Sequence, residues 1–353
     1  MNILGIMSGT SLDGVDLALC HFETTKGKLQ WNILQAATLP YTEDWQYRLQ
    51  TAHLQSGYDL TLLDVEYGKL LGDIVCDFIA KNNLEKSDIH AVASHGHTVF
   101  HQPGLGITLQ IGSGAHFAAR TGLNVINDFR IQDVAQGGQG APLVPIGDQL
   151  LFSAYSHCLN LGGIANVSYE KGGVRTAGDI CPANMVLNQL ARLQGLNYDE
   201  DGRLAQSGIV NDELLKQLNE LPFYRLAFPK SLGREWVEQN IQALLEQSEL
   251  SVVDQLATFV EHIGQQVGKA IENGDSGQLL ITGGGALNTF LVDRIQHYTQ
   301  HQVVLPEREV IDYKEALIFA LLAYLKYAGE INVFASVTGS GRDHIAGVEF
   351  KIS

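Results

Sequence analysis

The chain has 353 residues, a formal net charge of −16 and 45% hydrophobic residues. This length exceeds what one hydrophobic core usually serves, so we expect two domains of roughly 150 to 200 residues with a cleft between them. The negative charge argues against nucleic acid or an anionic membrane as a partner, because both attract basic surfaces. No apolar run reaches the roughly 18 residues that cross a bilayer, and the first residues are typical of a strand. The four cysteines form no CxxC pair, which favours reduced thiols and a cytoplasmic protein.

The first part of the chain combines predicted strands with two predicted helices. Strands are predicted at 2–7, 15–22, 29–36, 89–94, 108–111 and 124–127, and helices at 42–55 and 60–82. A glycine-rich stretch at 137–142 then interrupts the pattern, which is typical of a domain crossing or a substrate loop. We expect a first domain of residues 1–128 with 328–353, and a second domain of residues 129–327.

The strand pattern starts again beyond the glycine-rich stretch. Strands are predicted at 158–161, 164–169, 172–177, 278–282 and 344–350, and helices at 183–193, 212–221, 234–245, 252–272, from about 287, and at 313–327. Each half therefore opens with strands joined by a glycine turn. The predicted fold class is α/β, with two duplicated mixed-sheet domains.

The turn between the first two predicted strands, SGTSLDG at 8–14, combines glycines with hydroxyl side chains. Gly9 and Gly14 permit positive φ, and hydroxyls beside backbone N–H groups suit an anion-binding loop. The turn is not a Walker loop, because no Gly-Lys-Ser/Thr tripeptide follows and the next segment is a predicted strand. Taken alone, it is more typical of an ordinary hairpin than of a phosphate site.

Two further glycine turns follow predicted strands, Gly162-Gly163 and Gly283 to Gly285. Three such turns in two domains favour a single nucleotide site over structural turns, because two hairpins would hold phosphates while the third lets the backbone approach an adenosine. The residues predicted to bind the nucleotide are Gly9, Thr10, Ser11, Leu12, Asp13, Gly14, Val15, Asp16, Gly162, Gly163, Gly283, Gly284 and Gly285.

Seven segments spread over nearly the whole chain carry a family resemblance. They are MSGTSLDG at 7–14, SHGHT at 94–98, DFR at 128–130, GGQGAPLVP at 137–145, NLGGIAN at 160–166, PKSLGRE at 229–235 and KEA at 314–316. In this order they resemble the anhydro-N-acetylmuramic acid kinase family. The resemblance implies the actin-like ATPase and sugar kinase superfamily, with two ribonuclease H-like domains around an interdomain cleft, ATP and Mg²⁺ as cofactors, and a possible homodimer.

The reaction that this resemblance implies opens the 1,6-anhydro ring of an amino sugar and phosphorylates O6. Water must then attack the anomeric carbon, so a carboxylate has to accept its proton. The resemblance assigns this role to Asp179, in the segment GDICPAN at 178–184. The family form of the segment is Asp-Thr-Gly-Pro-Gly-Asn. The residues that depart from the family pattern are Ile180, Cys181, Ala183 and, where an aspartate is common, Asn188.

The same resemblance places Arg130 and Glu315 at positions that face the sugar. The planar guanidinium of Arg130 suits the lactyl carboxylate of a muramic acid, and a structural salt bridge across the domains is the alternative. Asp13 is predicted to hold Mg²⁺ through water, with turn capping as its alternative. For Asp179 the alternative is a helix cap.

The sequence thus predicts a kinase that converts 1,6-anhydro-N-acetylmuramic acid, water and MgATP to N-acetylmuramic acid 6-phosphate in cell-wall recycling. Its predicted partner is this small amino sugar, with neither nucleic acid nor membrane. A first alternative is a non-catalytic ATP- or sugar-binding regulator, which the altered Asp179 segment motivates. A second is a related kinase that acts on another sugar.

Overall fold

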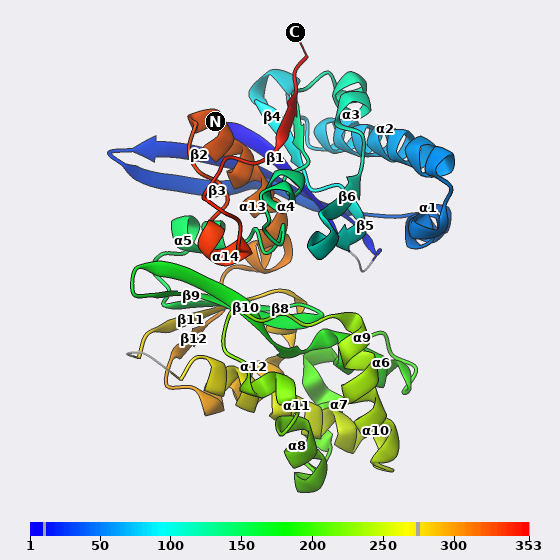
Figure 1. The fold of residues 1–353 in the computed structure, drawn as a ribbon, viewed down its shortest axis with the longest axis vertical. Helices are drawn as coiled ribbons and strands as arrows, with labels where there is room; N and C mark the ends of the chain where they lie inside the picture. The colour runs from blue at the N-terminus through cyan, green and yellow to red at the C-terminus, as the bar shows by residue number, and fades with distance from the viewer. Residues whose placement is uncertain (10–11, 273–275, 353) are drawn as a thin grey trace. The chain divides into compact units, whose positions relative to one another are not determined.

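Two β-sheets organise the chain, one in each of two units (Figure 1). The computed structural model describes residues 1–9, 12–272 and 276–352. The first unit combines Met1–Leu151 with Tyr313–Ser353, and the second is Phe152–Asp312. These bounds differ from the expected boundaries at 128 and 328. The difference arises because the segment after 128 and most of the last long helix pack on elements of the first unit.

The sheet of the first unit has the strand order β13-β7-β4-β1-β2-β3. Its strands are β1 (Asn2–Ser8), β2 (Gly14–Thr25), β3 (Lys28–Pro40), β4 (Ala91–Ser94), β7 (Val125–Asn127) and β13 (Val348–Phe350). β2 pairs antiparallel with both β1 and β3, whereas β1, β4 and β7 run parallel. A separate two-stranded sheet joins β5 (His97–Gln102) to β6 (Ile107–Ile111).

Helices cover both faces of this first sheet. The helices that lie wholly or mostly in this unit are α1 (Glu43–Gln50), α2 (Gly57–Lys81), α3 (Gly114–Thr121), α4 (Ile131–Ala135), α5 (Pro145–Leu151), α13 (Arg308–Ala328) and α14 (Ala335–Thr338). Leu4 and Ile6 of β1 belong to the apolar core that includes Tyr67 and Leu71 of α2. Gly5 between them faces α13, where a Cβ atom would lie 1.9 Å from the carbonyl oxygen of Ala316. Only glycine permits so close an approach of a helix to a central strand.

The sheet of the second unit has the strand order β10-β9-β8-β11-β12. Its strands are β8 (His157–Leu161), β9 (Ile164–Lys171), β10 (Val174–Pro182), β11 (Gln278–Thr282) and β12 (Gln302–Val304). The helices are α6 (Asn184–Arg192), α7 (Arg203–Ser207), α8 (Asp212–Asn219), α9 (Arg234–Val237), α10 (Ala243–Gln247), α11 (Val252–Ala270) and α12 (Thr289–Tyr298). One buried cluster joins sheet residues such as Leu159 and Ile281 to Leu187 of α6 and Phe259 of α11.

The two sheets repeat one topology. In each unit a meander of three antiparallel strands is followed by two strands that run parallel to the first, so the order reads third, second, first, fourth, fifth. Helices separate the parallel strands, as crossover connections require. This repeat confirms the predicted α/β fold with duplicated mixed sheets. Among the helices that the structure describes, none is both long and apolar enough to span a membrane.

Most predicted elements are present, with shifted ends. The sequence prediction missed several elements that are short or mixed in polarity, namely α3, α4, α5, α7, α14, β5 and β12. The third strand of the second unit was predicted to end at 177, but β10 continues to Pro182 through a register irregularity between Asp179 and Cys181. That extension places Asp179 inside a strand, where the sequence pattern indicated a connection to a helix.

Candidate functional site

The turn between β1 and β2 is anchored by a buried polar network. Ser8 Oγ lies 2.8 Å from the hydroxyl of Tyr41 and 3.3 Å from Nδ1 of His97, and the Tyr41 hydroxyl lies 2.5 Å from that of Tyr67. Burial lowers the pKa of His97 to about 4, so its imidazole is neutral at physiological pH. Thr10 and Ser11 of the predicted nucleotide site lie outside the described residues.

The other predicted residues of this turn have differing environments. Leu12 has a φ of 60° and Asp13 is exposed at the turn. Gly14 has a structural reason to be glycine, because a Cβ atom there would lie 2.4 Å from the carbonyl oxygen of Leu39. Val15 is buried in the core, and Asp16 Oδ1 accepts a 2.6 Å hydrogen bond from Thr38. The hairpin geometry is confirmed, and nucleotide binding by these residues stays a prediction.

Arg130 is held from two sides in the first unit. Its Nε–H donates to Nε2 of His95 over 2.9 Å, and Nη1 donates to the carbonyl oxygen of Gly140 over 2.6 Å. His95 Nδ1 lies 3.0 Å from the carbonyl oxygen of Gly96. A carbonyl only accepts, so Nδ1 carries the proton and Nε2 is free to accept from Arg130. Burial and the Arg130 charge hold the pKa of His95 well below its ordinary value.

The guanidinium keeps its charge in this position. Burial lowers the pKa of Arg130 to about 10, while Glu315 and Asp133 oppose that shift. Its two hydrogen bonds use two of five N–H groups, which leaves three without a partner among the described residues. An oxyanion is the natural partner for such a planar donor set.

Glu315 lies near this arginine on α13, and its carboxyl is electrostatically coupled to it. The side chain retains contact with solvent, yet surrounding protein removes enough hydration to raise the pKa of Glu315. Arg130 opposes this increase and the negative charge of Asp16 adds to it. Both Arg130 and Glu315 belong to the first unit, so a salt bridge between domains, the alternative for this pair, is wrong.

Two of the three glycine turns come together in the second unit. A Cβ atom at Gly283, where φ is 81°, would lie 2.6 Å from Oδ1 of Asn160, and one at Gly285 would lie 2.7 Å from Cβ of Leu161. Asn184 joins the two turns, because its Nδ2 donates to the carbonyl oxygen of Leu161 over 3.0 Å and lies beside Gly284.

The Gly162-Gly163 turn presents backbone donors. Its two carbonyl oxygens accept hydrogen bonds from the first amides of α6, at 2.8 Å for Ala183 to Gly163 and 3.1 Å for Asn184 to Gly162. In a trans peptide the N–H and C=O groups point in opposite directions. The amides of Gly163 and Ile164 therefore point away from α6, and Gly163 is exposed. Such amides suit a phosphate oxygen.

A row of polar residues crosses four strands of the second sheet. Thr282 of β11 pairs with Asn160 of β8, Asn160 with Asn166 of β9, and Asn166 with Asp179 of β10. Directly paired residues share one face of a sheet. The neighbouring residues Leu161 and Ala165 belong to the buried core on the opposite face. The row thus extends from the glycine turns to Asp179. At ordinary strand spacing, Asp179 lies about 10 Å from Asn160, two strands away.

Main-chain hydrogen bonds hold Asp179 to the segment at 230–232. Its amide donates to the carbonyl oxygen of Lys230 over 2.8 Å, and its Oδ2 accepts from the amide of Leu232 over 2.8 Å. Burial raises the pKa of Asp179, while the Leu232 amide and the Lys230 charge limit that rise. The position before α6 that a cap would occupy belongs to Ala183. The helix-cap alternative for Asp179 is therefore wrong.

The residues that depart from the family pattern lie mostly away from this polar face. Ile180, Cys181 and Ala183 are buried and belong to the apolar core of the second unit. Burial raises the pKa of Cys181 far above its ordinary value, so it is a neutral thiol. Asn188 is half-buried on α6. Three of the four departures thus change core packing and leave the polar row intact.

No group of three or more His, Cys, Asp or Glu side chains within residues 1–9, 12–272 and 276–352 is arranged to hold a metal ion. The Mg²⁺ of a nucleotide site takes most of its ligands from phosphates and water, with one or two carboxylates from the protein. Asp13, exposed at the first turn, is chemically suited to that limited contribution.

Comparison with known proteins decides the family. A family model described as anhydro-N-acetylmuramic acid kinase matches residues 1–351. The chain belongs to the anhydro-N-acetylmuramic acid kinase family. The relative of that name from Vibrio vulnificus strain CMCP6 is 35% identical over 369 residues, with 99% of this chain and 98% of the relative covered. The one from Mannheimia succiniciproducens is 37% identical over 372 residues, with 98% of each chain covered. These findings confirm the predicted family and its kinase class.

Solved structures with similar backbones are more distant. One is component A of the (R)-2-hydroxyglutaryl-CoA dehydratase of Acidaminococcus fermentans, at 14% identity and a TM-score of 0.48, covering 93% of this chain and 99% of that one. Another is a ROK family glucokinase from Streptomyces griseus in complex with glucose and AMPPNP, at 12% identity and a TM-score of 0.42, covering 91% and 99%.

The sequence alone assigned no role to three polar residues of these sites, which are His95, Asn160 and Asn166. Asn184 was expected to cap or orient the Asp179 loop, and its side chain instead bonds to the carbonyl oxygen of Leu161. A signal was available for two of the three, because Asn160 and Asn166 are symmetrically placed about the Gly162-Gly163 turn and a hairpin pairs such positions. His95 was visible only as part of SHGHT, since nothing in the sequence indicates its contact with Arg130.

Proposed function

We propose that this chain catalyses the ATP-dependent hydrolytic opening of 1,6-anhydro-N-acetylmuramic acid, with phosphorylation of O6 to give N-acetylmuramic acid 6-phosphate. The observation that carries this proposal is the placement of Asp179. It lies at one end of a polar row whose other end adjoins two glycine turns. Family membership over residues 1–351 supports the same reaction.

Asp179 acts as the general base. One carboxylate oxygen is engaged by the Leu232 amide, so the other is available to take a proton from the attacking water. Partial burial raises the pKa of Asp179, which strengthens its carboxylate as a base. A base of this kind typically contributes a factor of about 10² to 10⁴ to the rate.

Arg130 binds the lactyl carboxylate of the sugar. Its orientation is fixed by His95 and Gly140, and its remaining N–H groups form the planar fork that pairs with a carboxylate. Glu315, whose carboxyl interacts electrostatically with Arg130, completes the sugar-binding set as an acceptor for a hydroxyl or amide group. Both roles extend what the family resemblance implies.

The glycine turns bind ATP. The outward amides of Gly163 and Ile164 supply backbone donors for the phosphates in the second unit, and the turn at Gly9 to Asp16 supplies those of the first. The exposed Gly284 lets the backbone approach the adenosine. ATP provides the phosphoryl group, and Mg²⁺ would neutralise its phosphate charge with Asp13 as a ligand through water. A cytoplasmic location, a role in peptidoglycan recycling and a homodimer are further parts of the proposal.

The replacement Asp179→Asn tests the assignment of the base. Purified variant and parent are incubated with MgATP and the anhydro sugar, and release of ADP and formation of the sugar phosphate are followed. We expect the rate to fall by about 10² to 10⁴. Asp199→Asn is the matched control, because Asp199 in the same unit also accepts main-chain amides, from Leu204 and Ala205. A parental rate in the Asp179 variant would refute the assignment.

The same assay separates the alternatives. A non-catalytic regulator would bind ATP or the sugar without releasing ADP. A kinase for another sugar would release ADP only with that sugar. Four altered residues motivate the regulator, and three of them, Ile180, Cys181 and Ala183, lie in the apolar core, which supports the kinase over the regulator.

A further inference from the structure

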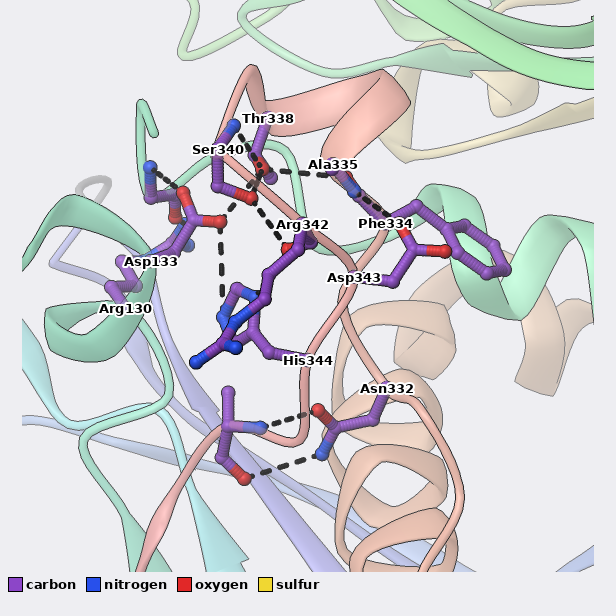
Figure 2. A network of polar contacts seen from close by, with 12 residues as sticks. Arg130, Asp133, Asn332, Phe334, Ala335, Thr338, Ser340, Arg342, Asp343 and His344 are labelled. Carbon is purple, nitrogen blue, oxygen red and sulfur yellow. Dashed lines mark hydrogen bonds and ion pairs between the residues drawn. The ribbon is translucent and has the colours of Figure 1, made fainter. Parts of the chain in front are cut away.

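The C-terminal segment that follows α13 contributes three side chains around Asp133 of α4 (Figure 2). Thr338 Oγ1 donates to Asp133 Oδ1 over 2.7 Å across 205 positions of sequence. Nε2 of His344 lies 3.8 Å from the same oxygen, and Ser340 Oγ lies 3.2 Å from the Thr338 hydroxyl. Asp133, Thr338 and His344 are all buried, so this contact is sheltered from solvent.

The second carboxylate oxygen of Asp133 continues the connection toward Arg130. Asp133 Oδ2 accepts from the amide of Gly140 over 2.7 Å, and the carbonyl oxygen of Gly140 accepts from Nη1 of Arg130 over 2.6 Å. A parallel link runs from the amide of Gln139 to the carbonyl oxygen of Thr338, at 2.8 Å. The glycine-rich loop is therefore fixed between the C-terminal segment and the arginine.

Close approach explains why this loop is rich in glycine. A Cβ atom at Gly138 would lie 2.1 Å from Asp133 Oδ2 and 2.8 Å from Cβ of Ser340. Gly140 has a φ of 67°, where a Cβ atom would also lie 2.8 Å from Cγ2 of Val134. The loop thus closes directly on Asp133, and movement of that carboxylate would displace the backbone of Gly140.

We propose that Thr338 and Asp133 are positioning residues for the sugar substrate, which set the direction of the Arg130 guanidinium through the backbone of Gly140. The inference rests on the proposed role of Arg130 in binding the lactyl carboxylate. Neither residue needs to contact the substrate, because a bidentate pair with a carboxylate depends on the angle of the guanidinium plane. Loss of the Thr338 hydroxyl releases Asp133 Oδ1, and the loop with Gly140 then loses its fixed position.

Replacing Thr338 by valine removes the hydroxyl and keeps the shape. We expect Thr338→Val to raise KM for the anhydro sugar about tenfold, the loss of one hydrogen bond to a charged group. KM for ATP should remain unchanged, and Thr338→Ser should restore the parental KM for the sugar. If the valine variant does not fold, Thr338→Ala provides the same measurement. Thr121→Val is the matched control, because Thr121 is also fully buried in the first unit and bonds to helix carbonyls of α3.

A second variant separates this inference from the function on which it rests. Arg130→Met should raise KM for the sugar, and adding Thr338→Val to it should have little further effect, because both changes act on one contact. Suppose that Arg130→Met raises KM for the sugar. If Thr338→Val then behaves like Thr121→Val, or changes the KM values for sugar and ATP alike, the positioning role is wrong and the proposed function stands. If Arg130→Met leaves KM for the sugar unchanged, the role of Arg130 and the inference both fail.

Discussion

The Nε–H group of Arg130 donates a 2.9 Å hydrogen bond to Nε2 of His95. This contact requires a neutral imidazole with its proton on Nδ1, and the carbonyl oxygen of Gly96 stabilises that tautomer. His95 also packs against Phe319 of α13, with ring centroids 5.0 Å apart. The neutral histidine therefore orients the arginine and places no second positive charge beside it.

Removing this acceptor should weaken sugar binding. We expect His95→Leu to raise KM for the anhydro sugar by about tenfold or more, because a hydrogen bond to a charged group contributes about 1.5–3 kcal/mol. His95→Gln, whose amide oxygen is an acceptor, should retain more of the affinity. Steady-state kinetics with ATP saturating measures both. Equal KM values for the leucine variant and the parent would contradict the orienting role.

The sugar KM of the parent enzyme should stay level between about pH 6 and pH 8. Burial holds the pKa of His95 well below its usual value and lowers that of His97 to about 4, so both rings are already neutral at the acid end of this range. The pKa of Arg130 is lowered only to about 10, so its charge persists at the alkaline end. A histidine-like step in the KM profile would show that one of these rings titrates.

The acid limb of the rate profile should report Asp179. The base must be ionised, and because burial raises the pKa of Asp179, kcat/KM should begin to fall at a higher pH than an ordinary aspartate would cause. Lys230 opposes this rise, so Lys230→Met should move the acid limb to still higher pH. Arg234→Met is the control, since Arg234 is an exposed cation of the same segment that pairs with Glu238. A shift toward lower pH in the Lys230 variant would contradict the assignment.

Gly283→Ala should weaken ATP binding more than sugar binding. The new methyl group would approach Oδ1 of Asn160 to 2.6 Å, so the two glycine turns would have to separate. Gly195→Ala is the matched control, because Gly195 has a similar positive φ of 76° and no atom of the described residues lies within 4 Å of its Cβ position. Both variants should lose about 1–2 kcal/mol of unfolding free energy from backbone strain. Only Gly283→Ala should raise KM for ATP, and a parental value there would argue against a nucleotide contact.

Restoring the family residue at position 180 should affect stability more than catalysis. Ile180 is 2% exposed within the apolar core, so Ile180→Thr buries a hydroxyl and should lower the free energy of unfolding by about 1–3 kcal/mol. Because the side chain lies on the core face of β10, kcat should remain within about twofold of the parent. Denaturant unfolding and steady-state kinetics measure the two effects. A large gain in kcat would show that the threonine hydroxyl has a catalytic role here.

The sequence by itself determined the repeated elements and the identity of the principal residues. Apolar runs of strand length and the helices between them are local signals, so both halves of the fold were visible in the pattern. The glycine turns were equally visible, as was Asp179 through the segments it shares with the kinase family. The role of Asp179 as a base stays a prediction. From the sequence alone, the altered residues Ile180 and Cys181 indicated a change in the site itself.

Only the tertiary structure decided which way those neighbours face. A register irregularity in β10 places Asp179 beside Asn166 and sends Ile180 and Cys181 into the core, and no local pattern predicts such an irregularity. The same holds for Thr338 and Asp133, which are 205 positions apart and meet because the C-terminal segment returns to the first unit. Sequence patterns describe neighbours along the chain, whereas the orientation of Arg130 depends on hydrogen bonds between segments that only folding brings together.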